Sequence, residues 1–166
     1  MATAHLLGRP VPGSVTRSGM PASPRPVNAD RIEFSASATA PFWARQHTRL
    51  FLGNCGFARE AIDTAQAVVS ELTANAFNAT GNHSPAPLAY SQLARAGVIG
   101  LSLRHFPRFL LIEVIDASPE PPVMADPDTY SEHGRGLRVV AALSLQWGYF
   151  PVRNGKCVYS ILDIPG

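Results

Sequence analysis

The sequence has few lysines and cysteines, and its charge is nearly balanced. Among 166 residues, Lys156 is the single lysine, Cys55 and Cys157 are the two cysteines, and the net charge is +2. Two cysteines outside any CxxC pair build neither a disulfide framework nor a zinc site, so we expect reduced, structural thiols. So small a net charge argues against direct nucleic-acid binding. Because no apolar run reaches the ~20 residues of a membrane span, we expect a cytoplasmic protein that does not contact membranes.

Prolines, glycines and serines are concentrated at the N-terminus. Residues 1–29 hold three arginines, no acidic residue and no hydrophobic periodicity, a composition typical of a disordered tail. Such a tail is either a dispensable extension or a basic docking arm. The remaining residues, 30–166, have the length and composition of one globular domain with its own core.

Hydrophobic periodicity divides this domain into eight elements. Helical spacing and alternation predict helices over 40–52, 58–80 and 136–146, and strands over 31–37, 98–105, 109–116, 147–153 and 156–164. On the first helix we expect Thr39 to cap the N-terminus, and one side to be lined by Trp43, His47, Leu50 and Phe51. The order β-α-α-β-β-α-β-β predicts an α/β protein of the α+β kind. We expect a two-layer sandwich with helices on one face of a mixed, mostly antiparallel sheet.

A polar pair borders the apolar side of the predicted helix 58–80. The stretch VVSELTANAFNAT places Glu71 and Asn75 one turn apart, about 40° from each other around the helix axis, with Asn78 beside them. Carboxylates and amides near a core must find partners. The pair is therefore a structural hydrogen-bonding group, a solvated edge or part of a ligand site.

Two further features could carry chemistry. Asp116 ends the strand 109–116 on its apolar side, directly before a proline-rich stretch. It is either a turn cap or a recognition group at the lip of a pocket. Gly134 and Gly136 precede the helix 136–146, where glycines let a ligand approach backbone N–H groups and a helix N-terminus favours phosphate. A lone GxG motif is weak evidence by itself.

In this order, the three segments resemble the ATP-binding boxes of the Bergerat fold, which histidine kinases, gyrase B and MutL share. VVSELTANAF is similar to the N box and LLIEVIDASPEPP to the first glycine box, in a variant with Asp-x-Ser-Pro. HGRGLRVVAALSLQWGYFPVRNGKCVYSIL is similar to the second box, its helix and the closing hairpin. The resemblance covers roughly residues 30–163 and is strongest to bacterial anti-sigma factor serine kinases of the SpoIIAB and RsbW type. It implies a histidine kinase-like ATPase domain over residues 30–166.

The resemblance also implies a role for each box. Glu71 would be the catalytic general base that takes a proton from the attacking hydroxyl group or water, and Asn75 would coordinate Mg²⁺ on the phosphates of ATP. Asp116 would accept a hydrogen bond from the adenine amino group. Residues 117–133 would form a lid over the nucleotide. The residues expected to bind ATP are Asn75, Asp116, Ser118, Gly134, Arg135, Gly136 and Leu137.

The sequence departs from the family pattern near the site. Ala79 stands where the family often has His, and Ser118 and Glu120 stand at glycine positions. In the last strand, Cys157 matches a Thr that supports the adenine-binding Asp, and a thiol is the poorer hydrogen-bond partner. These departures bear on affinity and rate more than on the fold.

Three functions follow as hypotheses. The first is a serine/threonine protein kinase that phosphorylates an anti-sigma factor antagonist-like protein and binds a sigma factor in the alternative state. The second is a non-catalytic module that binds ATP or ADP together with a sigma factor or another regulator. The third is an interaction surface that uses no nucleotide. Members of the family often dimerise, so a homodimer is a candidate assembly.

Overall fold

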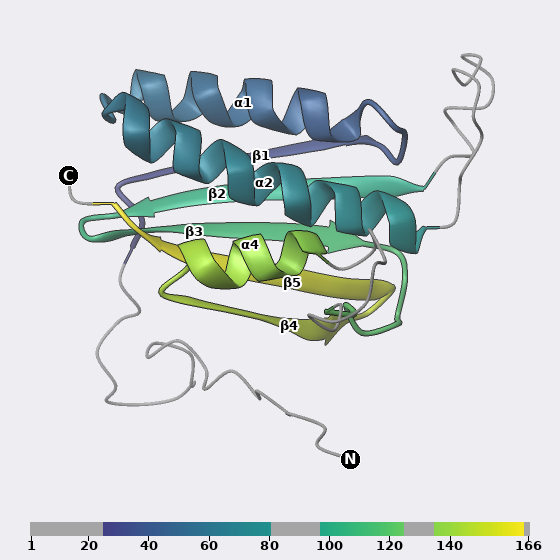
Figure 1. Ribbon diagram of the computed structural model, residues 1–166. Helices are drawn as coiled ribbons and strands as arrows, with labels where there is room; N and C mark the ends of the chain where they lie inside the picture. Colours follow the sequence, from purple (N-terminus) through teal and green to yellow (C-terminus); the bar gives the residue numbers. More distant parts are fainter. Residues whose placement is uncertain (1–24, 81–96, 125–134, 165–166) are drawn as a thin grey trace, which may run out of the picture.

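A computed structural model of the chain describes residues 25–80, 97–124 and 135–164. The strands are β1 (Asn28–Ser35), β2 (Val98–Phe106), β3 (Phe109–Asp116), β4 (Gln146–Val152) and β5 (Gly155–Asp163). The helices are α1 (Ala40–Asn54), α2 (Arg59–Ala79) and α4 (Arg135–Leu143) (Figure 1). The predicted order of strands and helices is confirmed.

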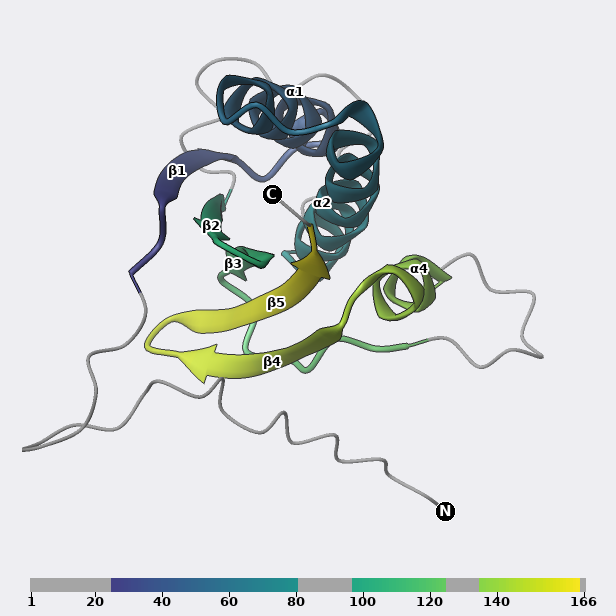
Figure 2. The same ribbon diagram turned by 90° about the vertical axis from the view of Figure 1, so that its left-hand side faces the viewer.

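The five strands form one sheet in the order β1-β2-β3-β5-β4, and every neighbouring pair is antiparallel. The described helices lie on one face of this sheet (Figure 2). There α1 packs against α2, and α4 packs against the other side of α2. The fold is the predicted two-layer α+β sandwich, because helices with one apolar side are buried against one side of a sheet.

The core fills the space between the sheet and the helices. From α2 it receives Ala65, Val68, Val69, Leu72 and Ala76, and from β3 Leu110, Ile112 and Val114. The first set repeats at helical spacing and the second at every other residue, as the periodicity predicts. Each large side chain buried in this way contributes roughly 1.5–3 kcal/mol to folding.

The buried side of α1 differs from the predicted one. The residues of α1 that face the core are Ala40, Ala44, Thr48 and Leu52. Trp43 and Leu50 are instead exposed, at 56% each. Small side chains let α1 pack closely, and the Thr48 hydroxyl is satisfied within the helix, where it donates to the Ala44 carbonyl oxygen at 2.8 Å. Thr39 does occupy the N-cap position, but its side chain makes no capping hydrogen bond.

Two predicted boundaries also shift. The helix predicted over 136–146 ends at Leu143, because the Leu145 backbone N–H donates to the Ile161 carbonyl oxygen at 2.8 Å and draws the chain toward β5. β1 begins at Asn28, within the region predicted as a tail. Across the described ranges, none of the helices combines the length and the apolar character that crossing a bilayer requires.

Candidate functional site

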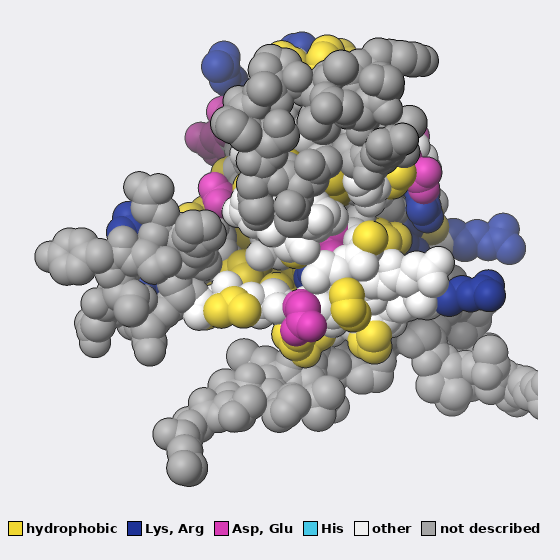
Figure 3. All heavy atoms as spheres, turned by 90° about the vertical axis from the view of Figure 1, so that its right-hand side faces the viewer, with side chains coloured by type: hydrophobic (Ala, Val, Ile, Leu, Met, Phe, Trp, Pro, Cys, Tyr) yellow, Lys and Arg dark blue, Asp and Glu magenta, His cyan; other side chains and the backbone are white. Residues whose placement is uncertain are grey.

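Three segments that are far apart in the sequence meet at one end of the sheet. This end holds the C-terminal part of α2, the end of β3 and the start of α4 (Figure 1), and α2 contacts both β3 and α4. Among the described atoms on this face, acidic side chains lie both in the middle, beside hydrophobic ones, and at the edges, and most basic side chains lie toward the periphery (Figure 3).

The two polar edges of α2 face different helices. On one edge, Ser70 accepts a hydrogen bond from Arg45 of α1 at 2.8 Å, and Gln66 donates to the Arg45 carbonyl oxygen at 3.1 Å. On the other edge, Glu71 lies against Gly136 of α4. The structural hydrogen bonds therefore join α2 to α1, and Glu71 lies on the opposite side, toward α4.

Gly136 makes room for the Glu71 carboxylate. A Cβ atom at position 136 would overlap Glu71 Oε2 and lie 3.1 Å from Cδ. The backbone of Gly136 does not adopt a positive φ angle, so space, and not backbone conformation, requires glycine here. The other glycine of the predicted GxG motif, Gly134, lies outside the described residues.

Asn75 presents an amide that lacks an internal partner. It lies one turn after Glu71, is half-buried, and its Nδ2 atom is buried without a hydrogen-bond partner among the described residues. Buried amide donors are rarely left in this state, so this NH₂ group could donate to an acceptor that the described residues do not provide. Its oxygen is a suitable ligand for Mg²⁺, which usually takes one or two protein ligands and fills its other positions with phosphate oxygens and water. In the described ranges, no cluster of three His, Cys, Asp or Glu could hold a metal ion.

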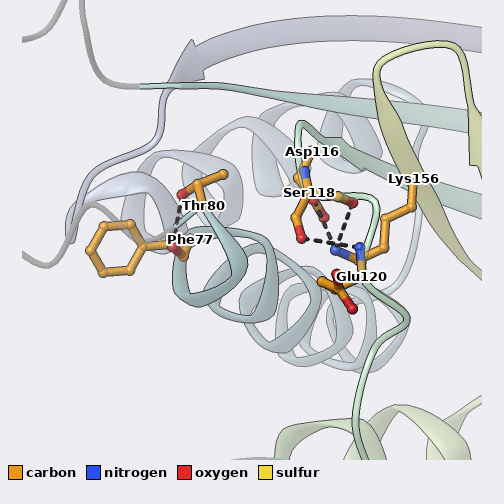
Figure 4. Close-up of polar contacts among 6 residues, drawn as sticks. All are labelled: Phe77, Thr80, Asp116, Ser118, Glu120 and Lys156. Carbon is orange, nitrogen blue, oxygen red and sulfur yellow. Dashed lines mark hydrogen bonds and ion pairs between the residues drawn. The ribbon is translucent and has the colours of Figure 1, made fainter.

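The two oxygens of Asp116 have different surroundings. The residue is only 1% exposed at the end of β3. Its Oδ1 atom accepts hydrogen bonds from Lys156 Nζ at 2.9 Å and from the Ser118 backbone N–H at 2.8 Å (Figure 4). Its Oδ2 atom is buried and has no partner among the described residues. One oxygen therefore caps the turn, and the other meets no donor among the described residues.

The residue beside Asp116 on the last strand is Lys156 and not Cys157. In the register of β3 and β5, Asp116 pairs with Lys156, and Ile115 pairs with Cys157. Because successive side chains point to opposite faces of a sheet, Cys157 lies on the face away from Asp116, and its predicted supporting role is wrong. Burial, reinforced by the charge of Glu113, raises the pKa of the Cys157 thiol to about 12.

Sequence reasoning missed Lys156, although two signals mark it. It is the single lysine of the chain, and it follows the hairpin turn in a strand whose other residues are mostly apolar. Its side chain is 1% exposed, and its Nζ atom also donates to the Ser118 carbonyl oxygen at 3.3 Å. A lysine is almost never buried without a partner, so the structure ties this ammonium group to the end of β3.

The other predicted site residues differ in their burial and contacts. Ser118 is half-buried, and its hydroxyl accepts a hydrogen bond from the backbone N–H of residue 120 at 3.3 Å. Arg135 is exposed at the start of α4. Leu137 is 2% exposed and belongs to the core, so its side chain is not a ligand group. Of the predicted lid, residues 117–124 contain neither helix nor strand, and 125–133 lie outside the described residues.

Comparisons with known proteins bear on the fold. Neither a family model nor a curated protein matches the sequence. Among solved structures, the chain is similar to the crystal structure of the RsbU and RsbW domains of Rv1364c from Mycobacterium tuberculosis, with a TM-score of 0.55 and 16% sequence identity. The match covers 84% of this chain and 33% of that chain, so this chain corresponds to about a third of the other. At this identity the similarity shows the fold alone.

Proposed function

We propose that this chain is an ATP-binding regulator that acts as a protein serine/threonine kinase in partner switching. One observation carries the proposal. The Glu71 carboxylate, lying against Gly136, and the unpartnered oxygen of Asp116 come from three separate segments that meet at one end of the sheet. These segments are the ones that resemble the ATP-binding boxes of anti-sigma factor serine kinases. The similarity to the RsbU and RsbW domain structure gives this chain a fold that is compatible with the proposed function.

In the proposed reaction, the residues of the chain orient ATP and move one proton. Asp116 Oδ2 accepts a hydrogen bond from the adenine amino group, and backbone N–H groups at the start of α4 face the phosphates. Asn75 would hold Mg²⁺, and the bound ion would supply charge neutralisation at the phosphates. The acceptor hydroxyl oxygen bonds to the γ-phosphorus while the bond to ADP breaks, and Glu71 takes the hydroxyl proton.

The proposed phosphoryl acceptor is a Ser or Thr of an anti-sigma factor antagonist-like protein. A sigma factor is the proposed partner in the alternative state, and a homodimer is the proposed assembly. In the transfer step, the chain supplies the nucleotide site and the base, and the antagonist-like protein supplies the acceptor hydroxyl group.

Equilibrium titration with ATP and ADP in the presence of Mg²⁺ tests the nucleotide site. We expect saturable binding by the wild type and a loss of about tenfold in affinity, or 1.4 kcal/mol, for Asn75→Ala. Asn78→Ala is the matched control, because Asn78 is the same residue type on the same helix but is exposed. A folded wild-type protein that binds neither nucleotide would refute the proposed function.

Phosphoryl transfer to a serine-containing antagonist-like protein tests the kinase activity. Glu71→Gln is expected to slow transfer by roughly 10²–10⁴-fold, the usual contribution of a general base, while ATP affinity stays close to that of the wild type. Glu60→Gln, at an exposed position in the first turn of the same helix, is the control. Equal rates of transfer by Glu71→Gln and the wild type would show that Glu71 is not the general base.

One observation favours a second candidate, a non-catalytic module that binds ATP or ADP and a sigma factor or another regulator. Ser118 and Glu120 occupy positions that are glycines in the first glycine box, and they are joined by a hydrogen bond from the Glu120 N–H to Ser118 Oγ at 3.3 Å. Part of that backbone is therefore already engaged. Tight nucleotide binding without transfer to any antagonist tested would favour this function.

A further inference from the structure

A buried ion pair joins β5, the last strand of the chain, to the end of β3 at the candidate site. Lys156 and Asp116 are direct partners in the register of β3 and β5, and their side chains are 1% and 0% exposed. Both point to the face that the helices cover, since they are paired across the strands and Asp116 follows Val114 of the core at every other residue. The pair therefore lies inside the protein, beside the place where a nucleobase would bind.

The two carboxylate oxygens of Asp116 accept different numbers of hydrogen bonds. The Oδ1 atom accepts two of them, from Lys156 Nζ at 2.9 Å and from the Ser118 N–H at 2.8 Å. The Oδ2 atom accepts none from the described residues, although it is buried. A carboxylate oxygen that is buried without a donor is costly, so this arrangement favours a bound group that brings a donor to Oδ2.

Lys156 holds the Asp116 carboxylate in this orientation. Figure 4 shows its side chain reaching from β5 to Asp116 and to Ser118, and its Nζ atom also donates to the Ser118 carbonyl oxygen at 3.3 Å. The ammonium group thus holds the carboxylate and the following turn together. Without the ammonium group, one of the two hydrogen bonds to Oδ1 is lost, the Asp116 side chain is free to rotate, and Oδ2 is no longer a fixed acceptor.

We infer that Lys156 is a positioning residue for nucleobase selection. By holding Oδ1, it leaves Oδ2 as the single acceptor for an exocyclic amino group, so the site selects a 6-aminopurine nucleotide over a purine nucleotide without that group. The inference rests on the proposed nucleotide site and adds to it a residue that acts through Asp116.

The affinity ratio between two nucleotides tests this role in the full chain. ATP and purine riboside triphosphate differ in the 6-amino group alone, so the ratio of their dissociation constants measures what that group contributes. A hydrogen bond to a charged acceptor predicts a ratio of about tenfold or more for the wild type. For Lys156→Met, which keeps the length of the side chain and removes its charge, we expect the ratio to fall toward one.

A second ion pair supplies the control. Arg104 and Glu113 form a partly buried pair at 2.6 Å, and Glu113 lies on the opposite face of the sheet from Asp116. Arg104→Met is expected to lower stability but to keep the wild-type ratio. An unchanged ratio in folded Lys156→Met would overturn the inference, because the pair would then be structural alone.

The wild-type protein gives an independent test if Lys156→Met does not fold. In a structure with a bound ATP analogue, Lys156 Nζ should remain on Oδ1, and the amino group should lie within hydrogen-bond distance of Oδ2. A displaced Lys156, or an amino group bound elsewhere, would overturn the inference while leaving the nucleotide site intact. A wild type that binds neither triphosphate would overturn this inference and the proposed function together.

Discussion

Gly136 lies so close to the Glu71 carboxylate that a Cβ atom at position 136 would overlap Glu71 Oε2. The contact joins the start of α4 to the middle of α2, and thereby brings two of the three sequence boxes into one site. It also gives the glycine a role different from the predicted one. In the described part of the chain, Gly136 accommodates a carboxylate of the protein itself.

The first prediction concerns Gly136→Ala. We expect a loss of about 1–3 kcal/mol in the free energy of unfolding, because the added methyl group forces Glu71 to move. Phosphoryl transfer should fall together with stability, since the proposed base is displaced. Urea unfolding and a transfer assay measure the two effects.

Two further variants test whether the loss in Gly136→Ala comes from the overlap with Glu71. Gly53→Ala is the matched control, because nothing lies within 4 Å of the added Cβ and the residue is inside α1; this change should raise stability by up to ~1 kcal/mol. In a Glu71→Ala background, Gly136→Ala should cost less than in the wild type. Additive losses would mean that the two residues are not coupled.

The second prediction concerns the stability of the buried ion pair. Lys156→Met alone should cost about 3–5 kcal/mol, because it leaves the Asp116 carboxylate buried without a countercharge. Adding Asp116→Asn should recover part of this loss, since no full charge then remains buried. Urea unfolding of the single and double variants checks this, and a double variant that is less stable than Lys156→Met would contradict it.

Periodicity predicts most of the fold. The spacing of apolar residues in α2 and the alternation in β3 each leave one arrangement that buries the apolar side chains, and the turn at Asn154–Gly155 gives the pairing of β4 with β5. The same reasoning locates Asp116 on the core side of β3. These features depend on residues close together in the sequence, which explains why they are visible without a structure.

The errors come from contacts over long distances in the sequence. The sequence predicts that the largest apolar residues of α1 line its buried side. The structure instead buries the small residues of α1 and exposes Trp43 at 56%, because small side chains let the helix pack closely. Lys156 meets Asp116 across 40 positions, and the strand register that joins them cannot be derived from composition. The match of Cys157 to the family pattern uses no register, and the register places Cys157 next to Lys156 but on the opposite face of β5.

The third prediction concerns thiol reactivity and its pH dependence. Burial raises the pKa of Cys55 and raises that of Cys157 from 9.0 to about 12, so both thiols should remain protonated near pH 8. A thiol reagent should modify Cys55 slowly in the folded protein, and Cys157 after unfolding. Mass spectrometry measures this, with Cys55→Ser as the control. Rapid labelling of Cys157 in the folded state would contradict the burial.

The same pKa has a consequence for stability. The unfolded thiol ionises at a lower pH than the folded one, so the unfolded chain loses its proton first as pH rises. The contribution of the protonated Cys157 thiol to the free energy of unfolding is therefore complete below pH 9 and is lost as pH rises toward about 12. Cys157→Ala should lose less stability than the wild type over this range.

The last prediction concerns Gly155, where the hairpin turn meets the candidate site. Its φ angle is 141°, and a Cβ atom there would overlap the Asp116 carbonyl oxygen. Gly56 is the matched control, because its φ of 82° is also positive but nothing lies within 4 Å of the added Cβ. Gly56→Ala should cost about 1–3 kcal/mol of backbone strain. Gly155→Ala should cost more, since the overlap adds to the strain, and it should weaken ATP binding by displacing Asp116. Equal losses in urea unfolding, with ATP affinity unchanged in Gly155→Ala, would show that the turn does not position the end of β3.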